Sequence, residues 1–126
     1  LDMDHFKEVN DVYGHVMGDN VLKMLGSFLK EQFREQDVIG RIGGDEFVIL
    51  LCNIGSRENM ESRIKNLHEK LREIHMEGME EYTFSFSAGI AFAPQDGDTF
   101  MELYQKADLA LYQVKRSGRN GYRIYK

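Results

Sequence analysis

The acidic side chains of a glycine-rich stretch are the residues of this chain best suited to chemistry. Asp45 and Glu46 come directly after Gly43 and Gly44, and the apolar run 47–51 follows them. Glycine permits the positive φ angles of a two-residue hairpin turn, so the stretch predicts two strands with both acids at the tip. Folding alone gives no reason to place two like charges there, whereas carboxylate oxygens are the ligands that Mg2+ prefers.

A second acidic pair, Asp2 and Asp4, stands where a strand over residues 1–3 is expected to end. If that strand lies beside the hairpin, Asp2 and either Asp45 or Glu46 converge on one or two metal ions. The alternative interpretation is that both pairs are surface acids in turns, where most Asp and Glu side chains are found.

The apolar spacing predicts the elements that must position these acids. It indicates helices over residues 5–13, from an N-cap at Asp19 to Phe33, from an N-cap at Ser56 to Ile74, and from a capping box at Thr99 to Val114. Strands are predicted over residues 38–42, 47–51, 82–92 and 122–125, with a bulge or close helix packing at Gly89. This order predicts an α+β fold, with a central, mostly antiparallel sheet and helices packed on one face.

The bulk composition is that of one ordinary globular domain. The chain has 126 residues, of which 42% are hydrophobic and 29% charged. The net charge of -5 argues against binding a nucleic-acid polymer through a basic face, but not against a nucleotide, because a metal ion can supply local positive charge. Cys52 is the only cysteine, which fits a reducing, cytoplasmic compartment. The longest apolar run, 47–52, is too short to span a membrane.

Together and in order, the short motifs of this chain resemble the GGDEF domain of diguanylate cyclases. The resemblance extends from Asp2 to Asn120 and rests on Asp2-x-Asp4-x-Phe6-Lys7-x-x-Asn10-Asp11-x-x-Gly14-His15-x-x-Gly18-Asp19 and on Gly43-Gly44-Asp45-Glu46-Phe47. It implies a ferredoxin-like fold similar to the palm of nucleotidyl cyclases and polymerases. It also implies a single catalytic domain over residues 1–126 that lacks the family's upstream helix and most of its first strand.

The implied reaction is the condensation of two GTP molecules into cyclic di-GMP with release of two pyrophosphates. The resemblance assigns Mg2+ or Mn2+ to Asp2, the backbone carbonyl of Met3, Asp45 and Glu46. One ion lowers the pKa of a ribose 3′-hydroxyl and the other clamps the triphosphate. Asp45 is also a candidate acceptor for the hydroxyl proton, although its metal role ranks first.

The same resemblance implies that Asn10 and Asp19 read the guanine base. A carboxylate accepts both adjacent donors of guanine, which adenine lacks, and the amide of Asn10 completes the guanine edge. The alternatives are an ordinary helical Asn10 and an Asp19 that only caps a helix. His15 either contacts the nucleotide or has a structural role, Phe6 is implied to lie near the ribose, and Gly44 is implied to line the substrate.

Lys115 and Arg119 are implied to neutralise the phosphates, with Lys7 as a further phosphate contact. Cationic capping of the last helix is the alternative. Arg34 and Asp37 match the Arg-x-x-Asp product-inhibition site at which the family binds cyclic di-GMP, with Arg63 or Lys65 as a helper. Alone, this pair would be a surface ion pair that contributes little.

Catalysis is expected in a homodimer, because each domain holds one GTP and therefore half of the site. The resemblance also implies an upstream sensory domain in a larger, membrane-anchored or soluble protein, with no membrane contact by this domain. Two other interpretations stay open. One is a sensor that binds GTP or cyclic di-GMP without turnover, or a fragment that is inactive in isolation. The other is a structural interaction domain that binds no nucleotide with Mg2+.

Overall fold

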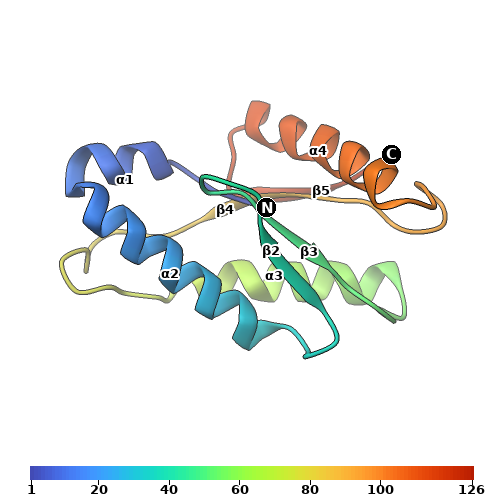
Figure 1. Ribbon diagram of the computed structural model, residues 1–126, viewed down its shortest axis with the longest axis horizontal. Coiled ribbons are helices and arrows are strands. Elements are labelled where there is room, and N and C mark those ends of the chain that lie inside the picture. The colour runs from blue at the N-terminus through green and yellow to red at the C-terminus, as the bar shows by residue number, and fades with distance from the viewer. The chain divides into compact units, whose positions relative to one another are not determined.

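The computed structural model describes all of residues 1–126, in four α-helices and five β-strands (Figure 1). The chain divides into two compact units. The first unit consists of Leu1–Asp4 and Ser85–Lys126, and the second unit is His5–Phe84. Helices and strands occur in both, so the expected α+β class is confirmed. No helix is both long enough and apolar enough to cross a membrane.

The first unit contains a three-stranded sheet with the order β1-β4-β5. β1 (Asp2–Met3) is antiparallel to β4 (Phe86–Ile90), with Asp2 opposite Ser87. β5 (Gly121–Ile124) is parallel to β4 and forms an edge of the sheet. The sheet is therefore mixed, with one antiparallel and one parallel pair.

Helix α4 (Phe100–Arg116) lies directly on β4 because Gly89 has no side chain (Figure 1). A Cβ at Gly89 would overlap the carbonyl oxygen of Ala107 and lie 2.5 Å from the backbone nitrogen of Leu111. This confirms close helix packing as the reason for a glycine within the strand. Thr99 begins the helix as predicted, with its hydroxyl accepting from the Glu102 amide at 3.2 Å.

Strand β4 is shorter than the predicted strand 82–92, although the alternation of buried side chains is real. Phe84, Phe86, Ala88 and Phe92 are all buried. At the C-terminal side the backbone leaves the ladder because the amide of Phe92 donates to the Asp96 carboxylate at 2.7 Å. Periodicity therefore reports burial here and overestimates the length of the strand.

The second unit contains three helices and a hairpin. The helices are α1 (Phe6–Tyr13), α2 (His15–Gln32) and α3 (Arg57–Arg72), and the hairpin pairs β2 (Val38–Arg41) with β3 (Phe47–Leu50). Ser56 caps α3 as predicted, accepting from the Asn59 amide at 3.1 Å. The buried side chains of this unit come mainly from α2 and α3 and include Val21, Leu22, Leu25, Phe28, Leu29, Met60, Ile64, Leu67 and Leu71.

The prediction that Asp19 caps the second helix is wrong. Helix α2 begins at His15 with Gly14 as its N-cap, so Asp19 lies inside the helix. The chain needs one residue to turn between α1 and α2, and Gly14 provides it at φ 90. Gly18 lies within α2, where the absence of a side chain leaves room for the amide of Asn10.

Replacing Gly89 with alanine tests the packing of α4 on β4. The new Cβ meets backbone atoms, which cannot rotate away, so we expect a loss of about 1–3 kcal/mol in the free energy of unfolding. Gly121→Ala in the neighbouring strand is the matched control, because a Cβ at Gly121 would lie 3.8 Å from its nearest atom, the carbonyl oxygen of Arg119. We expect it to change stability by less than about 0.5 kcal/mol. Equal urea midpoints for the two variants would contradict this account.

Candidate functional site

Asp2 and Lys115 meet in the first unit, where the last turn of α4 comes to strand β1. The Lys115 ammonium donates to Oδ2 of Asp2, whose residue is 7% exposed. The other carboxylate oxygen, Oδ1, is buried and has no hydrogen-bond partner. An unsatisfied buried oxygen costs free energy, which a hydrogen-bond donor or a hard cation would relieve. Asp2 therefore fits the role of a metal ligand.

Lys115 lies in the last turn of α4, and its ammonium contacts Asp2. The end of α4 is closed by the amide of Ser117, which donates to the carbonyls of Gln113 and Val114. Arg119 follows in the turn 117–120, is exposed and adopts φ 66. The first unit thus brings the predicted metal ligand Asp2 into contact with the predicted phosphate-binding Lys115. Arg119, the second predicted phosphate contact, follows four residues after Lys115. Met3, which follows Asp2 in β1, is also buried.

Asp4 is the residue of this region for which the sequence predicted no role of its own. Its carboxyl group accepts hydrogen bonds from the hydroxyls of Ser85 and Ser87 and from the amide of Asn120. The signal in the sequence was the Asp2-x-Asp4 spacing followed by two serines in the strand 82–92. Spacing alone could not show that these segments pair.

Asn10 and Phe6 converge on Gly18 in the second unit. A Cβ at Gly18 would overlap Oδ1 of Asn10 and would lie 3.5 Å from the ring of Phe6. The missing side chain therefore makes room for the amide of Asn10. Asp19 follows Gly18 directly and is exposed, as are Lys7 and His15. The structure thus places Asn10 of α1 against Gly18 of α2, one residue before Asp19, and the reading of guanine by Asn10 and Asp19 stays a prediction.

The hairpin tip carries Asp45 and Glu46 as predicted, but the connection has three residues and not two. The amide of Ile42 donates to the carbonyl of Glu46 at 2.9 Å, and the amide of Glu46 donates to the carbonyl of Gly43 at 3.1 Å. Gly43 and Gly44 adopt φ 95 and φ 50, so both use the positive φ angles that glycine allows. Asp45 and Glu46 are half-buried.

Neither unit contains three or more His, Cys, Asp or Glu side chains grouped so that they could hold a metal ion. Asp2 belongs to the first unit, and Asp45 and Glu46 belong to the second. Their joint role as ligands of Mg2+ stays a prediction.

Arg34 and Asp37 belong to a turn that the buried side chain of Asp37 stabilises through backbone hydrogen bonds. They are therefore more than the weak surface ion pair that the tetrapeptide alone would indicate. The Asp37 side chain is fully buried and accepts from the backbone amides of Arg34 at 3.0 Å and Cys52 at 3.2 Å. The guanidinium of Arg34 lies 3.6 Å from this carboxylate, and that of Arg63 lies 3.8 Å from it. Of the two expected helpers, Arg63 is therefore the one beside the pair, while Lys65 is exposed.

The contacts of Asp37 also set its ionisation. Burial raises the pKa of the Asp37 carboxyl, but the two backbone amides and the charges of Arg34 and Arg63 together outweigh this effect. The pKa is consequently held below its ordinary value.

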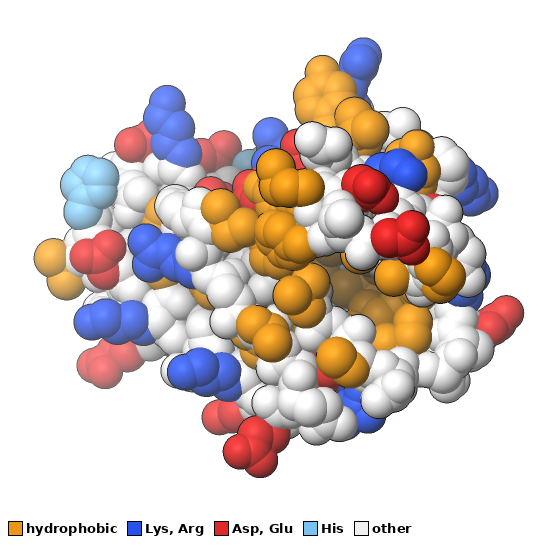
Figure 2. All heavy atoms as spheres, turned by 45° about the vertical axis from the view of Figure 1, so that its right-hand side comes forward, with side chains coloured by type: hydrophobic (Ala, Val, Ile, Leu, Met, Phe, Trp, Pro, Cys, Tyr) orange, Lys and Arg blue, Asp and Glu red, His pale blue; other side chains and the backbone are white.

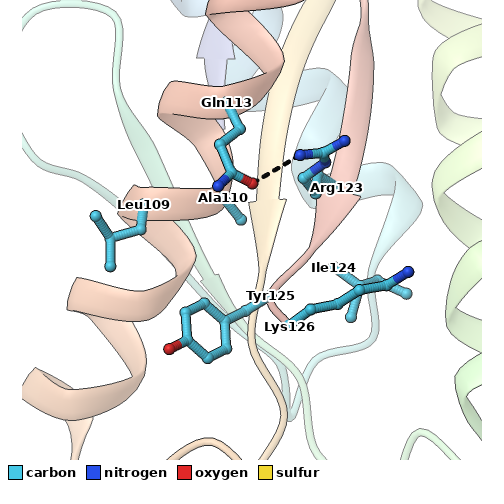
Figure 3. Close-up of a pocket in the computed structure, with 7 residues that line it drawn as sticks. All are labelled: Leu109, Ala110, Gln113, Arg123, Ile124, Tyr125 and Lys126. Atoms are coloured by element: carbon cyan, nitrogen blue, oxygen red, sulfur yellow. Dashed lines mark hydrogen bonds between the residues drawn. The ribbon is translucent and has the colours of Figure 1, made fainter.

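A pocket of about 360 Å³ lies at the other end of the first unit and contains none of the predicted site residues (Figure 3). It is lined by Leu109, Ala110, Gln113, Arg123, Ile124, Tyr125 and Lys126. Arg123 donates to the Gln113 side chain across it at 2.8 Å. Basic and acidic side chains both occur on the face shown in Figure 2.

The family model described as "Diguanylate cyclase, GGDEF domain" matches residues 1–121. The chain therefore belongs to the GGDEF domain family, and the resemblance read from the motifs is confirmed.

Three relatives show how far this similarity extends. The chain is 41% identical over 124 residues to "Bifunctional diguanylate cyclase/cyclic di-GMP phosphodiesterase MucR" of Pseudomonas aeruginosa, covering 97% of this chain and 18% of MucR. A structure of the GGDEF domain of PA1120 (TpbB or YfiN) from the same species is 35% identical, with a TM-score of 0.91 over 99% of this chain and 73% of that one. The GGDEF domain of DgcB from Caulobacter crescentus, solved in complex with c-di-GMP, is 25% identical, with a TM-score of 0.80 over 98% and 73% of the two chains. The chain thus spans less than a fifth of the length of MucR.

Removing the charge of Asp37 tests its role in the turn. Asp37→Asn places an amide group against two backbone donors, so we expect a loss of about 1–3 kcal/mol in the free energy of unfolding at pH 7. A carboxyl group whose pKa is lowered on folding stabilises the fold above its unfolded pKa of about 3.9, and this contribution disappears as the pH falls through the folded pKa. The difference between wild type and variant should therefore shrink below about pH 4.

Glu35→Gln is the matched control for this measurement, because Glu35 is exposed in the same segment. We expect it to change the free energy of unfolding by less than about 0.5 kcal/mol at any pH. A difference between wild type and Asp37→Asn that stays constant from pH 7 to pH 3 would contradict the account.

Proposed function

We propose that this chain is the catalytic domain of a diguanylate cyclase, which condenses two GTP molecules into cyclic di-GMP and releases two pyrophosphates. Membership of the GGDEF family and similarity to relatives named diguanylate cyclases support the proposal. The observation that carries it is the meeting of Asp2 and Lys115. There, a buried carboxylate with one unsatisfied oxygen lies beside a cation at a helix end. This combination suits a metal–polyphosphate ligand.

Asp2, the Met3 carbonyl, Asp45 and Glu46 are the proposed ligands of Mg2+ or Mn2+. When bound, the metal lowers the pKa of the ribose 3′-hydroxyl and neutralises phosphate charge. Lys115 and the residues that follow it then bind the triphosphate. Such a site contributes positioning and electrostatic stabilisation and needs no covalent intermediate.

The remaining assignments concern the cations and the base. Lys115 supplies a point charge to the β- and γ-phosphates, Arg119 a forked contact, and Lys7 a further one. Asp19 accepts from guanine N1–H and N2–H2, and Asn10 binds the base edge from the space that Gly18 leaves open. The assignments of Phe6 to the ribose, and of His15 and Gly44 to the nucleotide, rest on the family motifs.

We further propose that catalysis takes place in a homodimer, because each domain holds one GTP. The partner domain supplies the second nucleotide, whose α-phosphorus the 3′-hydroxyl attacks. An upstream sensory domain in the whole protein is part of the same proposal.

Product inhibition at Arg34 is proposed as well. DgcB, a neighbour in structure, was solved with c-di-GMP. In this chain Asp37 fixes the turn that presents Arg34, and Arg63 adds a second guanidinium on the same carboxylate. Guanidinium groups can stack on guanine and fork to its N7 and O6 atoms or to phosphate.

The proposal is tested by incubating the chain with GTP and Mg2+ and measuring cyclic di-GMP and pyrophosphate. We expect Asp45→Asn to lower product formation at least about a hundredfold, because it removes a negative charge from a metal ligand. Asp108→Asn is the control, since Asp108 is an exposed acid on α4 outside the site. It should leave the rate unchanged, and circular dichroism should show that both variants fold.

Two outcomes would count against the cyclase. Binding of GTP without any pyrophosphate release would favour a sensor that works without turnover. Equal rates for Asp45→Asn and wild type would remove the metal role of the hairpin tip.

A further inference from the structure

Asp4 is a buried acid whose neighbours are hydrogen-bond donors without charge. Asp4 is only 3% exposed to solvent. Oδ1 accepts from the Ser87 hydroxyl at 2.6 Å, and Oδ2 accepts from the Ser85 hydroxyl at 2.7 Å and from the Asn120 amide at 2.9 Å. No Lys, Arg or His side chain forms an ion pair with it. Asp4 therefore joins three segments of the first unit by hydrogen bonds alone.

The turn that contains Asn120 needs such an anchor. Arg119 and Asn120 both adopt positive φ angles, 66 and 50, which residues with a side chain rarely adopt. These conformations cost free energy and persist only where contacts with the surrounding structure offset that cost. The Arg119 amide donates to the carbonyl of Val114 at 3.0 Å, which closes the turn onto the helix. The Asn120 amide donates to Asp4, which ties the turn to the segment that follows β1.

The stretch 115–120, which ends in this turn, carries the two main predicted phosphate cations. Lys115 is in the last turn of α4 and contacts Asp2, two residues before Asp4. Arg119 precedes Asn120 directly. The two acids of the Asp2-x-Asp4 segment thus hold both ends of the stretch 115–120, one through a side chain and one through the backbone.

We propose that Asp4 is a positioning residue for the triphosphate of the substrate. It fixes the Arg119–Asn120 turn, and through that turn it fixes the direction in which the Arg119 guanidinium is presented to phosphate. Asp4 itself touches no substrate in this account. The inference rests on the proposed function, because the turn matters for binding only if its cations meet a polyphosphate.

The hydrogen-bond chemistry of Asp4 provides a discriminating pair of variants. In Asp4→Asn the amide oxygen can accept from Ser85 and Asn120, while its NH2 group donates to the Ser87 hydroxyl, which rotates to accept. In Asp4→Ala the Asn120 amide loses its partner. Ser87→Ala is the matched control, because it removes one donor and keeps the bond between Asp4 and Asn120.

The experiment is calorimetry of the chain and the three variants with GTP and with GMP, both with Mg2+. We expect Asp4→Ala to weaken GTP binding at least about tenfold, as is typical for one lost charge-assisted contact, and GMP binding less than about threefold. Asp4→Asn and Ser87→Ala should stay within about threefold of wild type for both nucleotides. Rescue by the asparagine variant separates positioning from a requirement for the carboxyl charge.

The proposal is overturned if Asp4→Ala binds GTP as wild type does, or if it loses GTP and GMP equally. Should Asp4→Ala fail to fold, hydrogen exchange of the Asn120 amide in the wild-type chain decides. A protected amide supports the anchor, and exchange at the rate of an unstructured peptide overturns it. A wild-type chain that binds no GTP at all with Mg2+ counts against the proposed function, whereas the exchange measurement still tests the anchor.

Discussion

The hydrogen-bonding demand of two buried carboxyl groups, Asp2 on the short strand β1 and Asp4 directly after it, is the constraint on which the site of this domain depends. A polar group withdrawn from water must find partners or lose free energy. The Asp4 carboxyl group accepts from three donors and thereby joins β4 and the turn at Asn120 to the segment after β1. The Asp2 carboxyl group accepts only from Lys115, and its other oxygen has no hydrogen-bond partner. The difference assigns the two acids different roles. Asp4 stabilises the fold of the first unit through its hydrogen bonds, and the unsatisfied oxygen of Asp2 is the one that we propose binds a cation.

Both units use a glycine to bring functional groups close together. In the first unit Gly89 lets the backbone of α4 lie on β4, which brings the last turn of the helix and Lys115 to strand β1. In the second unit Gly18 leaves a space on α2 that the amide of Asn10 fills. A side chain at either position would separate the elements or displace the polar group. These glycines therefore contribute through the contact they allow and not through turn conformations.

The sequence predicted features that depend on neighbouring residues, and it missed features that depend on pairing between distant segments. The glycine hairpin with its two acids and the cap at Ser56 were found because their signals are local. Asp19 has the residue type of an N-cap, whereas α2 begins four residues earlier and continues through Gly18, where the Asn10 amide packs. The anchoring role of Asp4 depends on serines more than 80 residues away in sequence, and the burial of Asp37 depends on the amide of Cys52. No spacing rule reports such contacts.

Binding of Mn2+ in the presence of GTP, followed by electron paramagnetic resonance, tests the central claim most directly. We assign the unsatisfied oxygen of Asp2 to a cation, so wild type should bind the ion. Asp2→Asn, which keeps the shape of the side chain but removes its charge, should bind at least about tenfold more weakly. Equal affinities of wild type and Asp2→Asn for Mn2+ would contradict the account.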